Sequence, residues 1–227
     1  MRRSLTGALA LGVVVLVVLW LMFQHRPGWY QPVTVDDAAV QRAQASAARL
    51  VDRISDRLAV GEPVEAVLAG GEVNEWLASL PQLWPEAGQA VPEGFSDLAV
   101  GFERGQLRIG AHLQNGQVQA IMHLSLAVEL AADRARLKIR LVTVRSGALP
   151  VPRTALEELL ERFQSTAEWS EDLGAFGGIL SGVQSVEELF DGIEVHNRFV
   201  WPNGDRPFRI SSITSEKGAL RIKLEPI

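Results

Sequence analysis

Apolar and polar residues alternate one by one through the centre of the chain, from Leu98 to Leu141. A period of two places every second side chain on the same face of a β-strand. Short turns at 104–105, 115–116 and 133–134 divide the segment, and Asn-Gly at 115–116 is typical of a tight hairpin. The pattern predicts a four-stranded antiparallel meander over 98–145. Its apolar rows are Leu98, Val100, Phe102; Leu107, Ile109, Ala111, Leu113; Val118, Ala120, Met122, Leu124, Leu126, Val128, Leu130; and Leu137, Ile139, Leu141.

The turn positions also predict how the strands pair. A two-residue loop at each turn places apolar residues opposite apolar residues in every hairpin, on one common face. A one-residue slip would turn that face over, so the agreement among the hairpins supports the assignment. The pairs expected are Phe102–Leu107, Leu113–Val118, Ala111–Ala120, Ile109–Met122, Leu107–Leu124, Leu130–Leu137, Val128–Ile139 and Leu126–Leu141.

On either side of the meander, apolar residues recur every three or four positions, as they do along one face of a helix. The stripes predict amphipathic helices over 36–58 and 153–164, the second with Thr154 and Glu157 as a capping box. The fold expected is α+β, a long antiparallel meander packed against amphipathic helices. Shorter elements are expected as a helix from Gly70 to Pro81, a helical turn capped by Ser185 and Glu188, and strands at 64–69, 193–201, 208–213 and 219–225.

The N-terminal region has a different pattern, because residues 4–23 carry no charged side chain. A helix of that length reaches about 30 Å, the thickness of the hydrocarbon core of a bilayer. Arg2 and Arg3 precede it, which favours a cytoplasmic N-terminus. We expect residues 1–30 to form a cytoplasmic tip, a transmembrane anchor and a juxtamembrane segment. Residues 31–227 then form one extracytoplasmic domain on a single-pass membrane protein.

The length and flanks of this apolar run disfavour two alternatives to an anchor. A cleaved signal peptide has a shorter apolar region and a small-residue cleavage site, and none follows Trp20-Leu21-Met22-Phe23. A buried helix of a globular domain is disfavoured because the run is apolar on all sides. Trp20, Trp29 and Tyr30 are expected at the outer membrane interface, where aromatic side chains are enriched.

Composition narrows the possible functions of the domain. The chain has 227 residues and a net charge of −5, which disfavours nucleic acid and anionic headgroups as partners. It contains no cysteine, so disulfides, thiolate nucleophiles, thiolate metal sites and lipoprotein attachment are excluded. With 47% hydrophobic and 22% charged residues, the body is expected to be globular.

Several sequence motifs together resemble a known group of proteins. They are Val73-Asn74-Glu75-Trp76-Leu77, Phe102-Glu103-Arg104-Gly105-Gln106-Leu107, Gly147-Ala148-Leu149-Pro150-Val151-Pro152 and Trp201-Pro202-Asn203-Gly204. In this order, behind an N-terminal anchor, they resemble YpmS-like and related single-pass membrane proteins of bacterial envelopes. The resemblance covers roughly residues 64–226 and carries over no catalytic residue. It implies a lipid held between a long curved sheet and helices.

No set of residues typical of an enzyme stands out. The predicted register places His112 opposite Gln119 and His123 opposite Arg108, so no two histidines face each other, and neither a metal site nor a cofactor is expected. Ser181 lies one position too late for a G-x-S-x-G nucleophile motif. No nucleophile, base and orienting group come together, so we expect a protein that is not an enzyme.

The apolar face of the meander is therefore the candidate site. It is expected either to be an ordinary core covered by the helices at 36–58 and 153–164, or to leave a groove for an acyl chain with the glycine-rich stretch 174–183 as its lip. We expect a membrane-anchored binding protein for a lipid or another apolar envelope component. The alternative is a non-catalytic scaffold or partner-binding subunit of an envelope assembly. The expected lining is Val100, Ile109, Met122, Leu124, Leu126, Ile139, Leu160 and Phe163.

Overall fold

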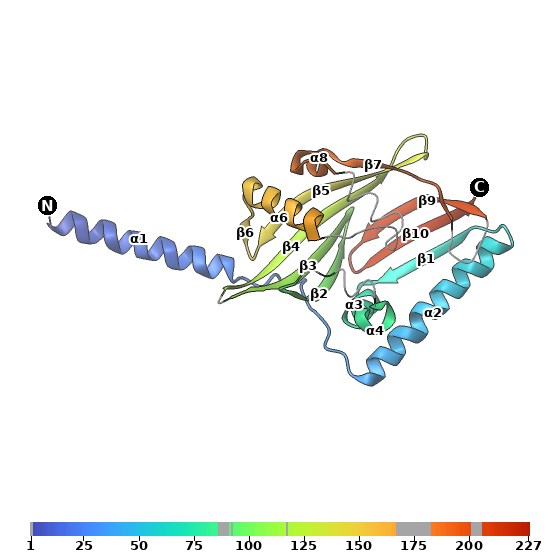
Figure 1. Ribbon diagram of the computed structural model, residues 1–227, viewed down its shortest axis with the longest axis horizontal. Coiled ribbons are helices and arrows are strands. Elements are labelled where there is room, and N and C mark those ends of the chain that lie inside the picture. Colours follow the sequence, from blue (N-terminus) through green and yellow to red (C-terminus); the bar gives the residue numbers. More distant parts are fainter. Residues whose placement is uncertain (1, 86–90, 92, 117, 167–182, 201–205) are drawn as a thin grey trace.

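The protein combines helices with two antiparallel sheets in a computed structural model, so the α+β class is confirmed (Figure 1). One sheet contains the central meander, and the other joins an N-terminal strand to the C-terminal strands. The expected glycine-rich lip at 174–183 lies outside the described residues except for Val183. The structure describes residues 2–85, 91, 93–116, 118–166, 183–200 and 206–227, without the side chains of 2–10, 12, 115, 118 and 162–166.

The predicted meander is the larger sheet. Its strands lie in the order β2-β3-β4-β5-β6, and β7 pairs with the other end of β5. The alternation of apolar and polar residues therefore placed the four long strands correctly. Their bounds are β2 Phe95–Glu103, β3 Gln106–Asn115, β4 Val118–Leu130, β5 Arg136–Ser146, β6 Leu149–Pro150 and β7 Ile193–His196.

Two of the three predicted hairpin registers are confirmed. Phe102 pairs with Leu107 across the first turn. Leu130 pairs with Leu137 across the third turn, and the pairs that follow it are those expected as far as Leu126–Leu141. A bulge beyond that pair shifts the register, so that Leu124 pairs with Val144.

The register predicted for the middle hairpin is wrong by two residues. Asn115 stays in the strand and pairs with Val118, which moves the turn one residue along, to Gly116 with a φ of 61°. Glycine adopts this left-handed conformation without steric cost. A shift of two residues keeps every side chain on its face, so the apolar face survives with different partners. The observed pairs are Leu113–Ala120, Ala111–Met122, Ile109–Leu124 and Leu107–Leu126, while His112 pairs with Ile121 and His123 with Gly110.

The second sheet has the order β1-β10-β9-β8. Its strands occupy the expected segments, but their separation from the meander was not predicted. The turns of two hairpins join the sheets, because Gly105 N donates to Ser215 O at 3.0 Å and Gly218 N donates to Phe102 O at 3.0 Å. The strands are β1 Val64–Ala69, β8 Phe199–Val200, β9 Pro207–Glu216 and β10 Ala219–Pro226.

Two buried asparagines act as partners for strand backbone. The Asn74 amide accepts from Val100 N at 2.6 Å and donates to Val100 O at 3.1 Å. Asn197 pairs in the same way with Ile210, at 2.8 and 2.7 Å. Each amide thus satisfies a buried backbone N–H and C=O as a neighbouring strand would. The sequence analysis assigned neither residue this role.

The long helix α2 (Asp37–Ala59) begins at an Asp36 cap, whose carboxylate accepts from Ala39 N at 2.7 Å. It packs on the second sheet and on α3, so the expectation that it covers the meander is wrong. Its stripe meets the apolar face of the short strands instead. The core formed there contains Ile54, Leu58, Val64, Ala66, Phe208 and Leu224, with Leu50, Phe199, Ile210 and Ile222 around it.

The remaining helices lie beside the sheets. The predicted cap of α8 is confirmed, because the Ser185 hydroxyl accepts from Glu188 N at 3.3 Å. The predicted capping box of α6 is wrong, because Thr154 lies inside a helix that already begins at Arg153. Helix α8 contacts β5 and also α6. The helices are α3 Gly70–Ala78, α4 Leu80–Leu83, α6 Arg153–Thr166 and α8 Val186–Asp191.

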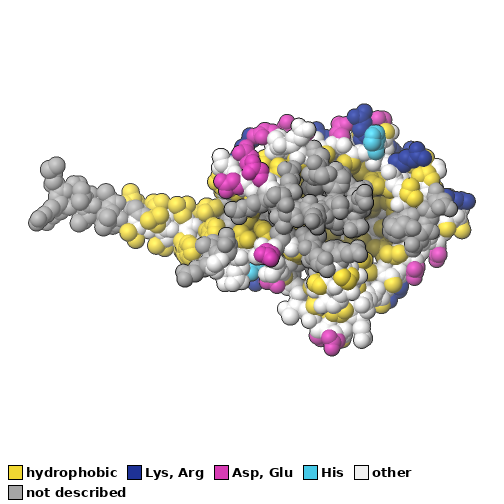
Figure 2. Space-filling model, in the orientation of Figure 1, with side chains coloured by type: hydrophobic (Ala, Val, Ile, Leu, Met, Phe, Trp, Pro, Cys, Tyr) yellow, Lys and Arg dark blue, Asp and Glu magenta, His cyan; other side chains and the backbone are white. Residues whose placement is uncertain are grey.

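Helix α1 (Arg2–Phe23) extends away from the body (Figure 1). Its described apolar side chains from Leu11 to Met22 are exposed, from 37% for Met22 to 67% for Leu16, and Figure 2 shows apolar side chains along the projecting helix. Its last turn is attached to the body where Ala148 N donates to Met22 O at 2.8 Å. Within the part of the chain that the structure describes, no helix has the length and apolar character required to cross a membrane.

Candidate functional site

The apolar residues predicted to line a site share one face of the meander. Val100, Ile109, Leu124 and Val144 lie directly opposite one another across four strands, and the remaining rows run parallel to theirs. We call this face the apolar wall. It consists of the rows Ala111, Met122; Val100, Ile109, Leu124, Val144; Phe102, Leu107, Leu126, Leu141; and Val128, Ile139, Ile193.

The apolar wall is only partly buried. Val100, Phe102 and Leu141 are 5–8% exposed. Of the predicted lining, Ile109, Met122, Leu124, Leu126, Ile139 and Leu160 are half-buried, and the side chain of Phe163 lies outside the description. The structure therefore brings five of the eight predicted residues together as half-buried side chains on one surface. Val100 lies on the same surface and is buried. Leu160 lies on α6 rather than on a strand of the meander.

The opposite face of the same strands carries small residues, which we call the glycine patch: Ala99, Gly101 and Gly110. Trp29 and Tyr30, from the segment between α1 and α2, fill it. A Cβ on Gly101 would lie 2.7 Å from Trp29 Cε3, and one on Gly110 would lie 2.9 Å from Tyr30 Cδ2. Only glycine permits so close an approach. The sequence analysis listed neither glycine, and their occurrence inside alternating strands was the available indication.

Tyr30 is buried on this face, with 2% of its surface exposed. Its hydroxyl donates to Asp97 O at 2.7 Å, where Asp97 has a φ of 52° at an irregularity in β2. Burial, together with the nearby Asp97 carboxylate, raises the pKa of Tyr30 to about 12. The expectation that Tyr30 lies at a membrane interface is therefore wrong for this residue, because it packs against the sheet.

His123 lies at the edge of the Trp29 ring, 5.7 Å between centroids. Its Nε2 lies 3.0 Å from Gly147 O, so this nitrogen carries the proton as a donor. The other nitrogen, Nδ1, is buried and has no hydrogen-bond partner among the described residues. Burial lowers the pKa of His123, the positive charges of Arg145, Arg108 and His25 lower it further, and the Gly147 carbonyl opposes them.

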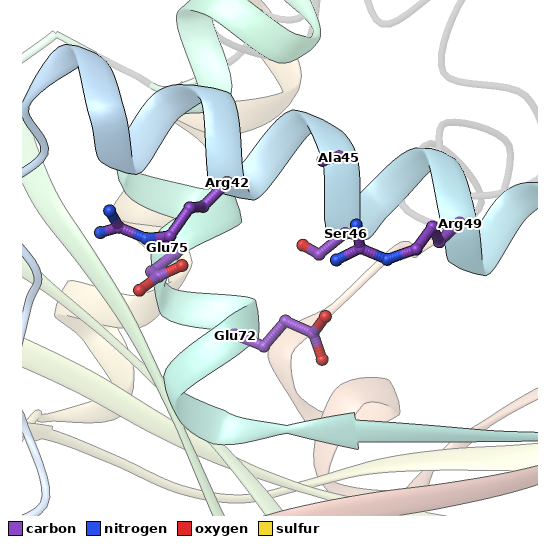
Figure 3. A pocket seen from close by; sticks show the side chains of 6 residues that line it. All are labelled: Arg42, Ala45, Ser46, Arg49, Glu72 and Glu75. Atoms are coloured by element: carbon purple, nitrogen blue, oxygen red, sulfur yellow. The ribbon is translucent and has the colours of Figure 1, made fainter.

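A polar cleft of about 380 Å³ opens between α2 and α3 (Figure 3). Arg42 and Glu75 point toward one another at one end, and Arg49 and Glu72 lie at the other. Beside it, Trp76 Nε1 donates to the Ser46 hydroxyl at 2.7 Å, which fixes the helices against each other. The opposite charges that line this cleft suit a polar surface rather than an acyl chain.

A second cleft, of about 240 Å³, lies where α1 meets the body. We call it the junction cleft, and it is lined by Val18, Leu21, Met22, His25 and Ala148. Gly147 lies at its border with a φ of 58°, and a Cβ there would collide with the carbonyl oxygens of Met22 and Phe23. Helix α1 and the sheet are thus in direct backbone contact.

Among the described residues, no three His, Asp or Glu side chains are grouped as metal ligands. Ser181 lies outside those residues, so the structure does not test its surroundings. No family model matches the chain, and neither a curated protein nor a solved structure matches it. The resemblance to YpmS-like proteins remains a prediction, and the site must be interpreted from its own geometry.

Proposed function

We propose that the protein is held in a membrane by α1 and binds a lipid, or another apolar envelope component, on the apolar wall. It does so by binding alone, without catalysis, on the extracytoplasmic side. The observation that carries the proposal is a continuous face of mostly branched aliphatic side chains that the protein leaves only partly buried, while Trp29 and Tyr30 cover the glycine patch on the opposite face. A contiguous apolar surface that the protein does not fully bury is typical of binding sites.

The anchor is supported by α1 itself. Residues 4–23 are uncharged, and the described apolar side chains from Leu11 to Met22 are exposed. An apolar helix that projects from a body in this way is unfavourable in water. A bilayer would cover all of its sides, which no single protein face does. Arg2 and Arg3 favour a cytoplasmic N-terminus.

The chemistry of the apolar wall favours an acyl chain over a polar ligand. The half-exposed members of its central rows, such as Ile109 and Leu124, offer no hydrogen-bonding group. Removing their apolar surface from water contributes about 25 cal/mol per Å². This attraction is non-directional, which suits a flexible hydrocarbon chain. Polar specificity would have to come from the ends of the sheet.

The experiment compares two substitutions on β4 in the full chain, purified in mild detergent and examined by native mass spectrometry. Leu124→Gln places an amide on the apolar wall, while Ile121→Gln places the same amide on the opposite face of the same strand. Both side chains are half-buried, so the pair is matched. We expect Leu124→Gln to lower the fraction of protein that carries lipid and Ile121→Gln to leave it unchanged.

The same anchor is present in both variants, so lipid retained around α1 contributes equally to each. Equal lipid occupancy in Leu124→Gln, Ile121→Gln and the unsubstituted chain would contradict binding on the apolar wall. Circular dichroism would establish that both variants retain their sheet content. A protein free of lipid throughout would argue for the alternative function.

The alternative is a scaffold or partner-binding subunit of an envelope assembly, and the polar cleft between α2 and α3 is the observation that favours it. Its two arginines and two glutamates present both charges on one surface, as a protein partner with a complementary pattern would require. Arg49→Glu should release such a partner from the full chain in detergent extracts. The double reversal Arg49→Glu with Glu72→Arg serves as a control for local charge balance. Retention of every associated protein by both variants would exclude this surface.

A further inference from the structure

The junction cleft has two chemically different sides. Val18, Leu21 and Met22 of α1 form its apolar side, and His25 lies at its polar end. Arg145 flanks it from β5, because its Nη1 lies 3.4 Å from the carbonyl oxygen of Ala148, which also lines the cleft. The cleft therefore combines a hydrocarbon surface with an adjacent positive charge.

The charge at this end is opposite in sign to the net charge of the chain, which is −5. Arg26 and Arg145 are both exposed here, and among the ion pairs of the described residues neither of them takes part. Arg108 lies on the same face of the sheet but is paired with Glu103 at 2.7 Å. Arg26 donates from its Nε to Tyr30 O at 3.2 Å and lies over the Tyr30 ring, so Arg145 is the arginine that remains available to an external anion.

We infer that the junction cleft binds a phospholipid of the surrounding bilayer and delivers it to the apolar wall. The acyl chain lies against the α1 side chains, and the phosphate lies beside Arg145 and His25. Arginine suits a phosphate because its planar fork of donors matches two oxygens. This inference rests on the proposed function, since α1 must be in a membrane for the cleft to lie at the headgroup level.

The route from cleft to wall follows the edge of the sheet. Ala148 lines the cleft, and the next residue, Leu149, pairs with Ser146 in β6. Ser146 in turn pairs with Met122, the member of the apolar wall nearest to α1. The cleft and this row of the wall therefore lie at the same end of the sheet, two strand pairings apart.

The test uses the full chain in nanodiscs that contain phosphatidylglycerol with a diazirine in one acyl chain. After irradiation, labelled peptides are quantified at Ala148, at Leu124 on the wall, and at the bilayer-facing part of α1 around Val14, which serves as the reference. We expect Arg145→Gln to lower the labelling at Ala148 about fivefold relative to α1, the effect of one basic residue near an anionic surface. Arg145→Lys should retain most of it.

Arg136→Gln is the control for distance from the cleft, because Arg136 is an exposed arginine at the opposite end of β5, where it pairs with Glu194 at 2.6 Å. It should leave all three labelling yields unchanged. Equal labelling at Ala148 in Arg145→Gln and in the unsubstituted chain would overturn the inference. Arg145 is exposed, so loss of folding is not expected, and retained labelling on α1 reports that the protein is inserted.

A second variant, Ala148→Trp, fills the junction cleft with a large side chain while keeping its backbone N–H. Labelling at Leu124 should then fall while that on α1 persists. Normal labelling at Leu124 in this variant would overturn delivery through the cleft and leave the proposed function intact. Labelling at Ala148 that depends on Arg145, without any at Leu124 in any variant, would support the phospholipid site and refute binding on the wall.

Discussion

The two faces of the meander differ in how they are covered. On one face, Trp29 and Tyr30 fit onto the glycine patch with contacts that leave no room for a Cβ on Gly101 or Gly110. On the other face, aliphatic side chains of the apolar wall remain half-exposed. One face of these strands thus has a site whose shape fits Trp29 and Tyr30 of the same chain. The other face has an apolar surface without such a shape. The first suits a permanent contact and the second suits a ligand that varies in shape.

The difference predicts that stability is concentrated on the filled face. Tyr30→Ala should cost about 3–5 kcal/mol of unfolding free energy, because it removes a buried aromatic ring. Tyr30→Phe keeps the ring and loses the hydrogen bond to Asp97, which costs about 1 kcal/mol. Chemical denaturation followed by circular dichroism measures both. Equal losses in the two variants would show that the hydroxyl, rather than the packing of the ring, holds the segment.

The glycine patch offers a complementary substitution from the side of the sheet. Gly110→Val should destabilise the protein by about 1–3 kcal/mol, because its side chain would collide with Trp29 and Tyr30. Ile109→Phe is the control, since the neighbouring residue points to the apolar wall, where it is half-buried. A red shift of the tryptophan fluorescence should accompany only the first change, because only that change displaces Trp29 from the sheet. A stable Gly110→Val protein with unchanged fluorescence would mean that the segment does not sit on the patch.

The strands of the meander could be predicted from the sequence, whereas the elements that pack on each face of the meander could not. Alternation fixes which face each side chain occupies, so the apolar wall was predictable, and the two-residue error at Asn115 left it unchanged. Alternation does not say which element packs on which face. The stripe of α2 fits any apolar surface. It packs on the second sheet because β1 pairs there with β10, a strand distant in sequence, and the two strands form an apolar face with β9.

The filled face was less predictable for a related reason. Gly101 and Gly110 lie in different strands, and only the register brings both under Trp29. The amide of Asn74 likewise becomes a strand partner only once α3 lies beside the edge of β2. For the junction cleft, the sequence contained Ala148 and α1 but no indication of their contact. Long-range contacts of this kind leave no periodic pattern in the sequence.

A smaller effect concerns His123, which adjoins the filled face. Because burial lowers its pKa in the folded protein, the unfolded chain binds more protons below the ordinary histidine pKa of 6.5. Stability should therefore be complete above about pH 6.5 and decrease as the pH falls below it. Denaturation at several pH values should show a flatter dependence in His123→Gln. An unchanged slope in that variant would assign the pH dependence to another group.

The smallest change in stability is expected on the apolar wall, where accessibility is the better measurement. The chain contains no cysteine, so single cysteines report on each face without background. Leu124→Cys should lower stability by less than about 1 kcal/mol, because the side chain is half-exposed and its replacement is apolar. Its thiol should react with a maleimide in the folded protein, more slowly when lipid is bound. Ala99→Cys, on the filled face where Ala99 is 0% exposed, should react only after unfolding. Equal reactivity at the two positions would show that the two faces do not differ in accessibility. Protection of Leu124→Cys in a lipid-free sample would show that the protein itself covers the apolar wall.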